Sequence, residues 1–147
     1  LGGVSMVLIS NADHARAAAW FAVRFGASVA APIGDRELLG EFTIDRWVGD
    51  GAVIEGISCI GVSGSKTPGE LAFLYEDTLI TGDLVRGQHA GRLNLLPNDK
   101  LDDRKAAIDS VRKLASLRGV EAVIVGDGQS VFRDGQARLA ELVATLA

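Results

Sequence analysis

Four short polar segments carry the side chains that could do chemistry in this chain. The first, Ser10-Asn11-Ala12-Asp13-His14, follows an apolar run and ends on a carboxylate beside an imidazole. The other three contribute Lys66, Asp83 and Asp127, each from a glycine-containing stretch. Carboxylates and imidazoles can coordinate divalent cations, and a lysine ammonium pairs with anions. These residues are therefore the first candidates for a catalytic or binding site.

The four segments, in this order, resemble the sequence landmarks of the metallo-β-lactamase fold family. Residues 9–14 stand where that family carries His-x-His-x-Asp-His, and residues 64–69 (Gly-Ser-Lys-Thr-Pro-Gly) resemble its Gly-x-His-Thr-Pro-Gly loop. Residues 80–83 (Ile-Thr-Gly-Asp) resemble its Thr-Gly-Asp strand end, and residues 125–128 (Val-Gly-Asp-Gly) its final Gly-His-Gly. The resemblance covers nearly the whole chain and implies an α+β fold, a metallo-β-lactamase-like αββα sandwich.

The resemblance also implies that one of the family's two metal sites is lost. Its ligands would be the first two histidines of the leading motif and the histidine of the Thr-Pro-Gly loop. Those positions hold Ile9, Asn11 and Lys66. An isoleucine cannot ligate, a neutral amide is a poor zinc ligand, and an ammonium repels any cation. We therefore expect at most one metal ion.

The second metal site of the family keeps residues that can ligate. Carried over, its ligands are Asp13, His14, Asp83 and Asp127, a set that favours Mn²⁺, Mg²⁺ or Fe²⁺ over Zn²⁺. In this interpretation Asp83 orients a metal-bound hydroxide, and Lys66 stabilises the oxyanion from the place of the lost metal. The prediction is a hydrolase with one divalent metal ion, acting on a small ester, amide, thioester or phosphoester.

Each motif also has a structural explanation. Asp13 could cap a helix that begins at His14, in the Ser-x-x-Asp form of a capping box. Thr67-Pro68-Gly69 is typical of a type II turn, and residues 126–128 of a turn after a buried strand. Lys66 among the carboxylates could form only an ion-pair network. The competing hypothesis is a non-catalytic relative with a degenerate, metal-free site used for binding or assembly.

Phosphoryl transfer of the haloacid dehalogenase type is a third hypothesis, and it fails on one residue. Residues 125–128 also resemble the Gly-Asp-Gly loop of that family, with Lys66 as its lysine. The family needs Asp-x-Asp after its first strand, with the first aspartate as nucleophile. The chain has Asn11-Ala12-Asp13 there, and an asparagine excludes nucleophilic attack.

A polar segment after Asp83 contains three further basic side chains, Arg86, His89 and Arg92. We expect this segment to be a loop beside the opening of the site, where a basic trio would suit an anionic group of a small-molecule substrate. Together with Asn11, these are the candidate substrate-binding residues. The alternative is an ordinary solvated loop.

The composition narrows the class of partner and the location. The chain has 147 residues and a net charge of -4 with no basic run, which argues against nucleic acid or an anionic membrane surface. The single Cys59 cannot form an intramolecular disulfide and fits a reducing compartment. No apolar run approaches the roughly 20 residues of a spanning helix, and no basic leader opens the chain. We therefore expect a cytoplasmic protein.

The apolar pattern predicts the elements that must position these residues. Helices are predicted over residues 15–25, 102–117 and 136–146, the first from the spacing of Ala18, Phe21, Ala22 and Phe25. Strands are predicted at residues 4–9, 28–31, 42–48, 52–54, 57–62, 71–75, 78–81 and 120–125. The first strand, helix and strand form a crossover that favours parallel neighbours, and residues 42–81 are expected to form an antiparallel meander.

A single domain over residues 1–147 is expected. Members of the resembling family usually have several strands before the first metal-binding loop, and only residues 4–9 precede it here. The missing strands would leave an apolar sheet edge, which soluble monomers seldom expose. We therefore expect a homo-oligomer, or a further segment upstream of Leu1.

Overall fold

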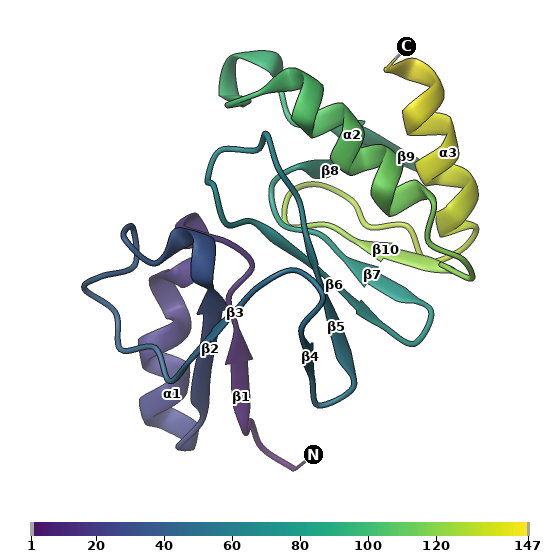
Figure 1. The fold of residues 1–147 in the computed structure, drawn as a ribbon. Helices are drawn as coiled ribbons and strands as arrows, with labels where there is room; N and C mark the ends of the chain where they lie inside the picture. Colours follow the sequence, from purple (N-terminus) through teal and green to yellow (C-terminus); the bar gives the residue numbers. More distant parts are fainter. Residues whose placement is uncertain (1, 147) are drawn as a thin grey trace.

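Two sheets pack face to face in the computed structural model, which describes residues 2–146 (Figure 1). The first sheet is parallel, in the order β1-β2-β3. Its strands are β1 (Met6–Leu8), β2 (Ser28–Pro32) and β3 (Arg46–Val48). The crossover from β1 to β2 passes through a 3-10 helix, Ala12–Ala17, and helix α1, Ala18–Phe25. β1 is an edge strand, because within residues 2–146 it pairs with β2 alone.

The second sheet has the order β10-β7-β6-β5-β4. Its strands are β4 (Val53–Ile54), β5 (Ile57–Gly61), β6 (Leu71–Tyr75), β7 (Thr78–Ile80) and β10 (Ala122–Ile124). Strands β4 to β7 form an antiparallel meander, and β10 joins β7 in parallel.

The remaining elements cover the outer side of the second sheet. They are the hairpin of β8 (Val85–His89) and β9 (Arg92–Leu95), helices α2 (Arg104–Ala115) and α3 (Gly135–Thr145), and the 3-10 helix Asn98–Lys100 before α2. A further 3-10 helix, Ile33–Asp35, follows β2 and lies against the chain at Gly69. Asp103 caps α2 by accepting hydrogen bonds from the backbone N–H groups of Lys105 and Ala106. Within residues 2–146, no helix has the length and apolar character that crossing a bilayer requires.

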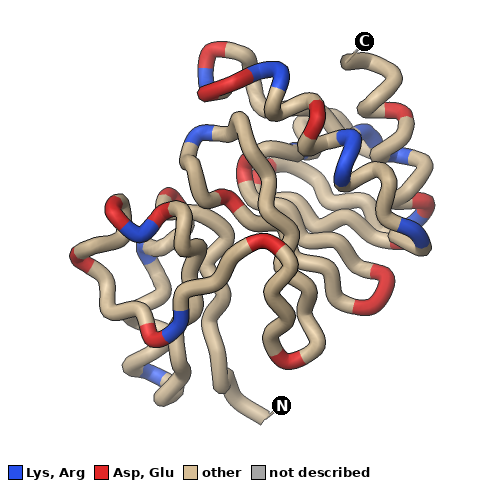
Figure 2. Tube along the Cα trace, in the orientation of Figure 1, with Lys and Arg blue, Asp and Glu red and all other residues tan. Residues whose placement is uncertain are grey.

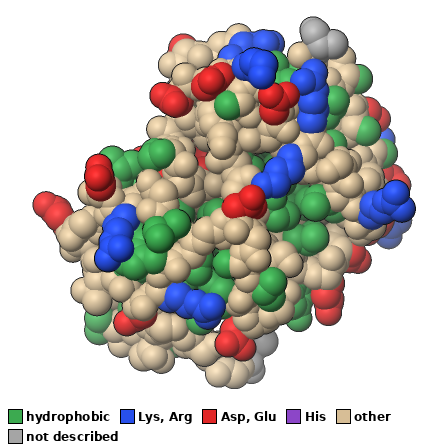
Figure 3. Space-filling view, in the orientation of Figure 1, with side chains coloured by type: hydrophobic (Ala, Val, Ile, Leu, Met, Phe, Trp, Pro, Cys, Tyr) green, Lys and Arg blue, Asp and Glu red, His purple; other side chains and the backbone are tan. Residues whose placement is uncertain are grey.

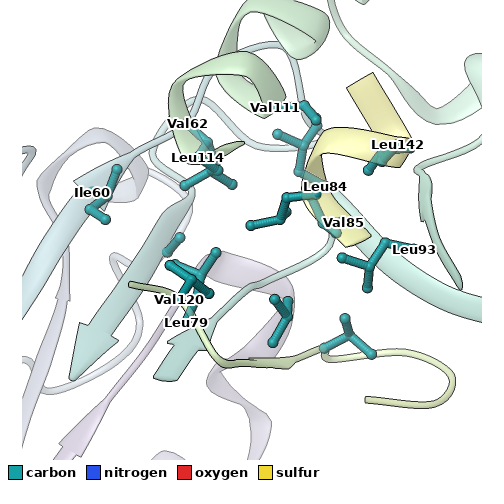
Figure 4. Close-up of a cluster of buried hydrophobic side chains, with 14 of the residues drawn as sticks. Ile60, Val62, Leu79, Leu84, Val85, Leu93, Val111, Leu114, Val120 and Leu142 are labelled. Atoms are coloured by element: carbon teal, nitrogen blue, oxygen red, sulfur yellow. The ribbon is translucent and has the colours of Figure 1, made fainter. Parts of the chain in front are cut away.

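Three apolar clusters fill the spaces between these layers. Val29 packs with Ala15 and Ala18 between α1 and the first sheet. Val48 of the first sheet meets Phe73 of the second between the two sheets. A third cluster lies beneath α2 and α3, where Leu79, Val111 and Leu142 are among its side chains (Figure 4). Helix, sheet, sheet and helix layers therefore follow one another, which is the αββα sandwich expected from the resemblance.

Two features of the third strand of the chain differ from the expectation. Residues 42–48 were expected as one strand of the meander, but only Arg46–Val48 is a strand, and it pairs in parallel with β2. The reason is a pair of hydrogen bonds between Asp45 and Val29. The Asp45 carboxylate accepts a hydrogen bond from the Val29 N–H at 2.7 Å, and the Asp45 N–H donates to the Val29 carbonyl. This pairing ties the segment to the first sheet.

The polar segment after Asp83 is also not a loop. It forms the β8-β9 hairpin, in which Val85 and Leu93 join the core beneath α2 and α3. Gly87 lets β8 approach the chain after β10, because a Cβ added there would lie 2.0 Å from the Gln129 carbonyl oxygen. The expectation failed because polar residues and a glycine hide the strand pattern.

Candidate functional site

The polar loops meet at one end of the two sheets. The loop that follows β1 is called the first loop. The Leu71 N–H at the start of β6 donates to the carbonyl of Ser10 in this loop at 2.8 Å, which joins the first loop to the second sheet. A Cβ added at Gly126 would lie 3.1 Å from the Gly82 carbonyl oxygen and 3.4 Å from Cε1 of His14. The segments after β1, β7 and β10 are therefore in contact, and glycines make this approach possible.

Where these loops meet, Lys66 forms an ion-pair network with Asp13 and Asp83. Its Nζ is 3.2 Å from Oδ2 of Asp83 and 3.5 Å from Oδ2 of Asp13. The Asp83 side chain is only 6% exposed and that of Lys66 is 29% exposed, whereas Asp13 is open to solvent. The alternative explanation of Asp13 as a helix cap is wrong, because Asn11 is the cap residue of the 3-10 helix and makes no side-chain cap hydrogen bond.

His14 lies beside this network. Its Nε2 is 3.8 Å from Oδ2 of Asp83, which is too long for a hydrogen bond. Its Nδ1 is hydrogen-bonded to the hydroxyl of Ser10 at 2.7 Å, which fixes the orientation of the ring. Ser10 was not expected as a site residue, although its position four residues before His14 is a signal for such a contact.

Asn11 is fully buried and acts as a donor. Its Nδ2 lies 3.2 Å from Oε2 of Glu70 and 3.2 Å from Oδ2 of Asp83. Its Oδ1, the only atom of the amide that could ligate a cation, has no hydrogen-bond partner among the described residues. The amide therefore bridges two carboxylates, and its burial leaves no surface for the expected contact with a substrate.

Glu70 is the second buried carboxylate of the site and was not expected from the sequence. It accepts hydrogen bonds from the Ser65 hydroxyl at 2.5 Å and from the Leu84 N–H at 2.8 Å. Burial raises the pKa of Glu70, and the negative charge of Asp83 raises it further, while the hydrogen bond from Ser65 opposes the shift. The available signal was a charged residue between Pro68-Gly69 and a wholly apolar strand.

Asp35 clamps two of the loops together and was also missed. Its side chain is fully buried, with Oδ2 accepting from the Ala12 N–H and Oδ1 from the Gly69 N–H, both at 2.7 Å. A Cβ on Gly69 would lie 2.4 Å from the Asp35 nitrogen, so only glycine fits there. Asp35 therefore fixes the first loop against the Thr-Pro-Gly loop.

Asp127 is paired with a basic side chain. It forms an ion pair with Arg86 of β8, whose side chain is nearly buried. The Arg86 Nε has no partner within the described residues. His89 and Arg92 face each other at the exposed end of the hairpin, and Arg92 lies beside α3. The structure therefore does not bring the expected basic trio together.

The arrangement does not fit a metal ion. Within residues 2–146, no three His, Cys, Asp or Glu side chains are placed so that they could hold one. Of the four ligands implied by the resemblance, Asp13 and Asp83 are paired with Lys66, and Asp127 with Arg86. Ile9 is buried in the apolar cluster beneath α1. The donors face cationic side chains, and metal binding stays a prediction.

Comparisons with known proteins agree with the fold. Residues 1–146 match the family model described as the metallo-beta-lactamase superfamily. TTHA1623 in a di-iron-bound form has a TM-score of 0.72 and 20% identity, over 93% of this chain and 75% of that one. A metallo-beta-lactamase from Pontibacter korlensis has a TM-score of 0.74 and 18% identity, over 97% and 69% of the two chains. DIM-1 metallo-beta-lactamase has a TM-score of 0.72 and 16% identity, over 98% of this chain and 70% of that one. No curated protein matches the chain.

Proposed function

The chain belongs to the metallo-beta-lactamase superfamily, and from that premise we propose that it is a metal-independent member, in which an ion-pair network stands in place of the metal centre. The proposed function is binding of a small molecule at this end of the sandwich, without metal-dependent hydrolysis. It corresponds to the non-catalytic relative considered from the sequence.

One observation carries this proposal, the position of the Lys66 ammonium 3.2 Å from Asp83. A divalent ion bound by Asp83 would lie within a few ångströms of that ammonium. Charges of +2 and +1 about 3 Å apart repel each other by roughly 10 kcal/mol at an effective dielectric constant of about 20. Asp83 can therefore pair with Lys66 or bind a metal ion, but it cannot do both in this geometry.

The network also supplies the cross-links that hold the loops. Lys66 joins the Thr-Pro-Gly loop to the first loop through Asp13 and to the end of β7 through Asp83. Asn11 and Glu70 connect the same loops from the buried side. The site can thus keep its shape through hydrogen bonds and ion pairs alone.

The exposed side of the network indicates the class of ligand. The Lys66 ammonium and the His14 ring both reach solvent, with side chains 29% exposed. A carboxylate or phosphate group of a small molecule would meet the Lys66 ammonium on this side, since a cationic donor favours an anion. We therefore assign a small anionic molecule as the ligand of this site.

A second candidate function rests on a different observation. Asp13 and Asp83 both contact the Lys66 ammonium, and His14 lies beside Asp83, so a swing of Lys66 toward solvent would free the two carboxylates, and a further movement of His14 could complete a metal site. Together with Asp127, they would hold one Mn, Mg, Fe or Zn ion in a hydrolase acting on a small ester, amide, thioester or phosphoester. Superfamily membership supports this candidate, because the similar TTHA1623 structure is in a di-iron-bound form.

Thermal unfolding with added metal separates the two candidates. The metal-independent protein should show the same Tm in EDTA and in Mn²⁺, Fe²⁺ or Zn²⁺. A metal ion present at 100 times its Kd would stabilise the native state by about 2.7 kcal/mol and raise the Tm by roughly 5–10 °C. A rise of that size that is lost in Asp83→Asn, but kept in the exposed control Asp77→Asn, would establish the metal-dependent candidate instead.

A further inference from the structure

Helix α1 directs its large apolar side chains away from the protein. Its sequence is Ala-Ala-Trp-Phe-Ala-Val-Arg-Phe, yet Ala18 is its only buried residue. Trp20 is 60% exposed and Val23 is 87% exposed. In an ordinary surface helix, the large apolar residues face the core and the polar ones face water. The small alanines take the core side here, so the large side chains are available to another surface.

The exposed aromatic side chains of α1 form an ordered cluster. The Trp20 and Phe21 rings meet edge to face with centroids 5.0 Å apart, and the Phe21 and Phe25 rings stack at 6.1 Å. The Arg24 guanidinium lies 5.4 Å from the centroid of Phe25. Aromatic and arginine side chains are enriched at the centres of protein interfaces, where preordered rings lose little entropy on binding.

A groove of about 650 Å³ runs along the other flank of α1. One wall is the helix itself, and the opposite wall is the segment before β3. The lining residues are Ala18, Ala19, Ala22, Val23, Val29, Glu41, Phe42, Thr43, Ile44 and Asp45. A ridge of apolar side chains therefore lies directly beside an apolar groove, and a two-fold symmetric contact requires this kind of self-complementary surface.

We propose that α1 and this groove form a homodimer interface, in which the outer side chains of each α1 enter the groove of a second copy of the chain. The charges support a second copy as the occupant. Arg24 is the only charged residue of α1, and Glu41 and Asp45 line the groove. Around a two-fold axis, each Arg24 would face the acidic residues of the partner, which gives two matching ion pairs.

The apolar area is also of the size that a dimer needs. Trp20, Phe21, Val23 and Phe25 are each exposed by more than a third. With about 150–250 Å² for a whole aromatic side chain, they present roughly 400 Å² per copy, as much as the largest patch of a typical monomer. The groove lining adds to this, toward the roughly 800 Å² per partner of a standard interface. Apolar side chains also reach the surface at several separate places on the face drawn in Figure 3.

A membrane fits this surface less well than a second copy. The trace of α1 is almost free of charge, and basic residues do not gather around it (Figure 2). Residues 1–46 contain five acidic residues and four arginines, which gives a net charge of -1. Helices that lie on anionic lipid usually carry a basic polar face. The surface is also distinct from the edge of β1, where the sequence led us to expect an oligomer contact.

The molar mass of the full chain in solution tests the proposal. We expect light scattering to give a mass twice the 15.4 kDa of one chain at 100 µM, with dissociation on dilution. Val23→Asp should raise the dimer Kd at least 10-fold without changing the circular dichroism spectrum, because Val23 makes little contact within its own chain. The matched control is Phe132→Asp, which changes a residue that is 70% exposed outside the patch and should leave the Kd unchanged.

Exchange of charges tests the two-fold arrangement itself. Arg24→Glu and Glu41→Arg should each weaken the dimer, and the double variant should recover most of the affinity. A wild-type chain that is monomeric at 100 µM would overturn the proposal, as would equal weakening by Val23→Asp and Phe132→Asp. Cosedimentation of monomeric wild type with phosphatidylserine vesicles, lost in Val23→Asp, would assign the surface to a membrane instead. None of these outcomes depends on whether the chain binds a metal ion.

Discussion

Nζ of Lys66 lies 3.2 Å from Oδ2 of Asp83, so that an ammonium and a nearly buried carboxylate connect two loops of the sandwich. The resemblance of residues 64–69 to the family's loop implies that this lysine stands in place of a metal-binding histidine. A fixed positive charge therefore neutralises Asp83 in this chain. This relationship explains how the loops can stay together without a metal ion, and it makes the stability of the protein sensitive to a single lysine.

Replacement of Lys66 should destabilise the protein. In Lys66→Met, the carboxylate of Asp83 stays buried without its cation, and we expect the free energy of unfolding to fall by about 1–3 kcal/mol. Urea denaturation at pH 7 measures the change. The control is Lys105→Met, which removes an exposed pair with Asp109 and should leave the free energy of unfolding nearly unchanged. Equal effects of the two substitutions would show that Lys66 is an ordinary surface lysine.

Glu70→Gln should change how stability depends on pH. Burial raises the pKa of Glu70, so the native state binds the proton more tightly than the unfolded chain does. The stabilising contribution of this proton is complete below the unfolded pKa of about 4.3 and is lost as the pH rises through the folded pKa. Glutamine has nearly the same shape and does not titrate. The variant should therefore gain stability relative to wild type as the pH rises from about 4 to 8.

Urea denaturation across that pH range measures the difference for Glu70→Gln. Glu37→Gln serves as the control, because Glu37 is exposed. The control should differ from wild type by a small and constant amount. A difference for Glu70→Gln that does not vary with pH would contradict the assignment of a raised pKa to Glu70.

Asp35→Ala should loosen two loops at once. The substitution leaves the N–H groups of Ala12 and Gly69 without their acceptor, and hydrogen bonds to a charged group contribute about 1.5–3 kcal/mol each. We expect a loss of about 2–4 kcal/mol in stability and faster hydrogen exchange at both amides. In the control Asp77→Ala, the exposed carboxylate accepts only from Thr78. Unchanged exchange at Ala12 and Gly69 would show that Asp35 is not the clamp.

The order of the motifs in the sequence predicted the loops that meet at the site, and apolar spacing predicted most of the elements. The strand expected at residues 71–75 is β6 without any shift. The buried acids Asp35 and Glu70 could not be predicted in the same way. A single carboxylate has no periodicity, and its burial depends on donors such as Ala12 and Ser65 that approach only in the folded chain.

Helix α1 shows a different limit of sequence patterns. The spacing of Ala18, Phe21, Ala22 and Phe25 predicted a helix correctly, because these residues recur every three or four positions. The spacing could not tell which apolar residues face the core. Only the alanine side packs on the first sheet, while Phe21 and Phe25 are exposed. When apolar residues lie on nearly all sides of a helix, the side that is buried depends on the distance between the helix and the sheet. The small alanines face the sheet where the two pack closely.

Metal content tests the central claim most directly. The chain should be purified without chelator and without a metal-affinity tag, and analysed for Mn, Fe, Zn and Mg by mass spectrometry. The ion-pair network of Lys66 and Asp83 predicts less than about 0.1 equivalent of any of these metals per chain, in wild type and in Asp83→Asn alike. A stoichiometric metal in the wild type that is lost in Asp83→Asn would contradict the account and establish the metal-dependent candidate.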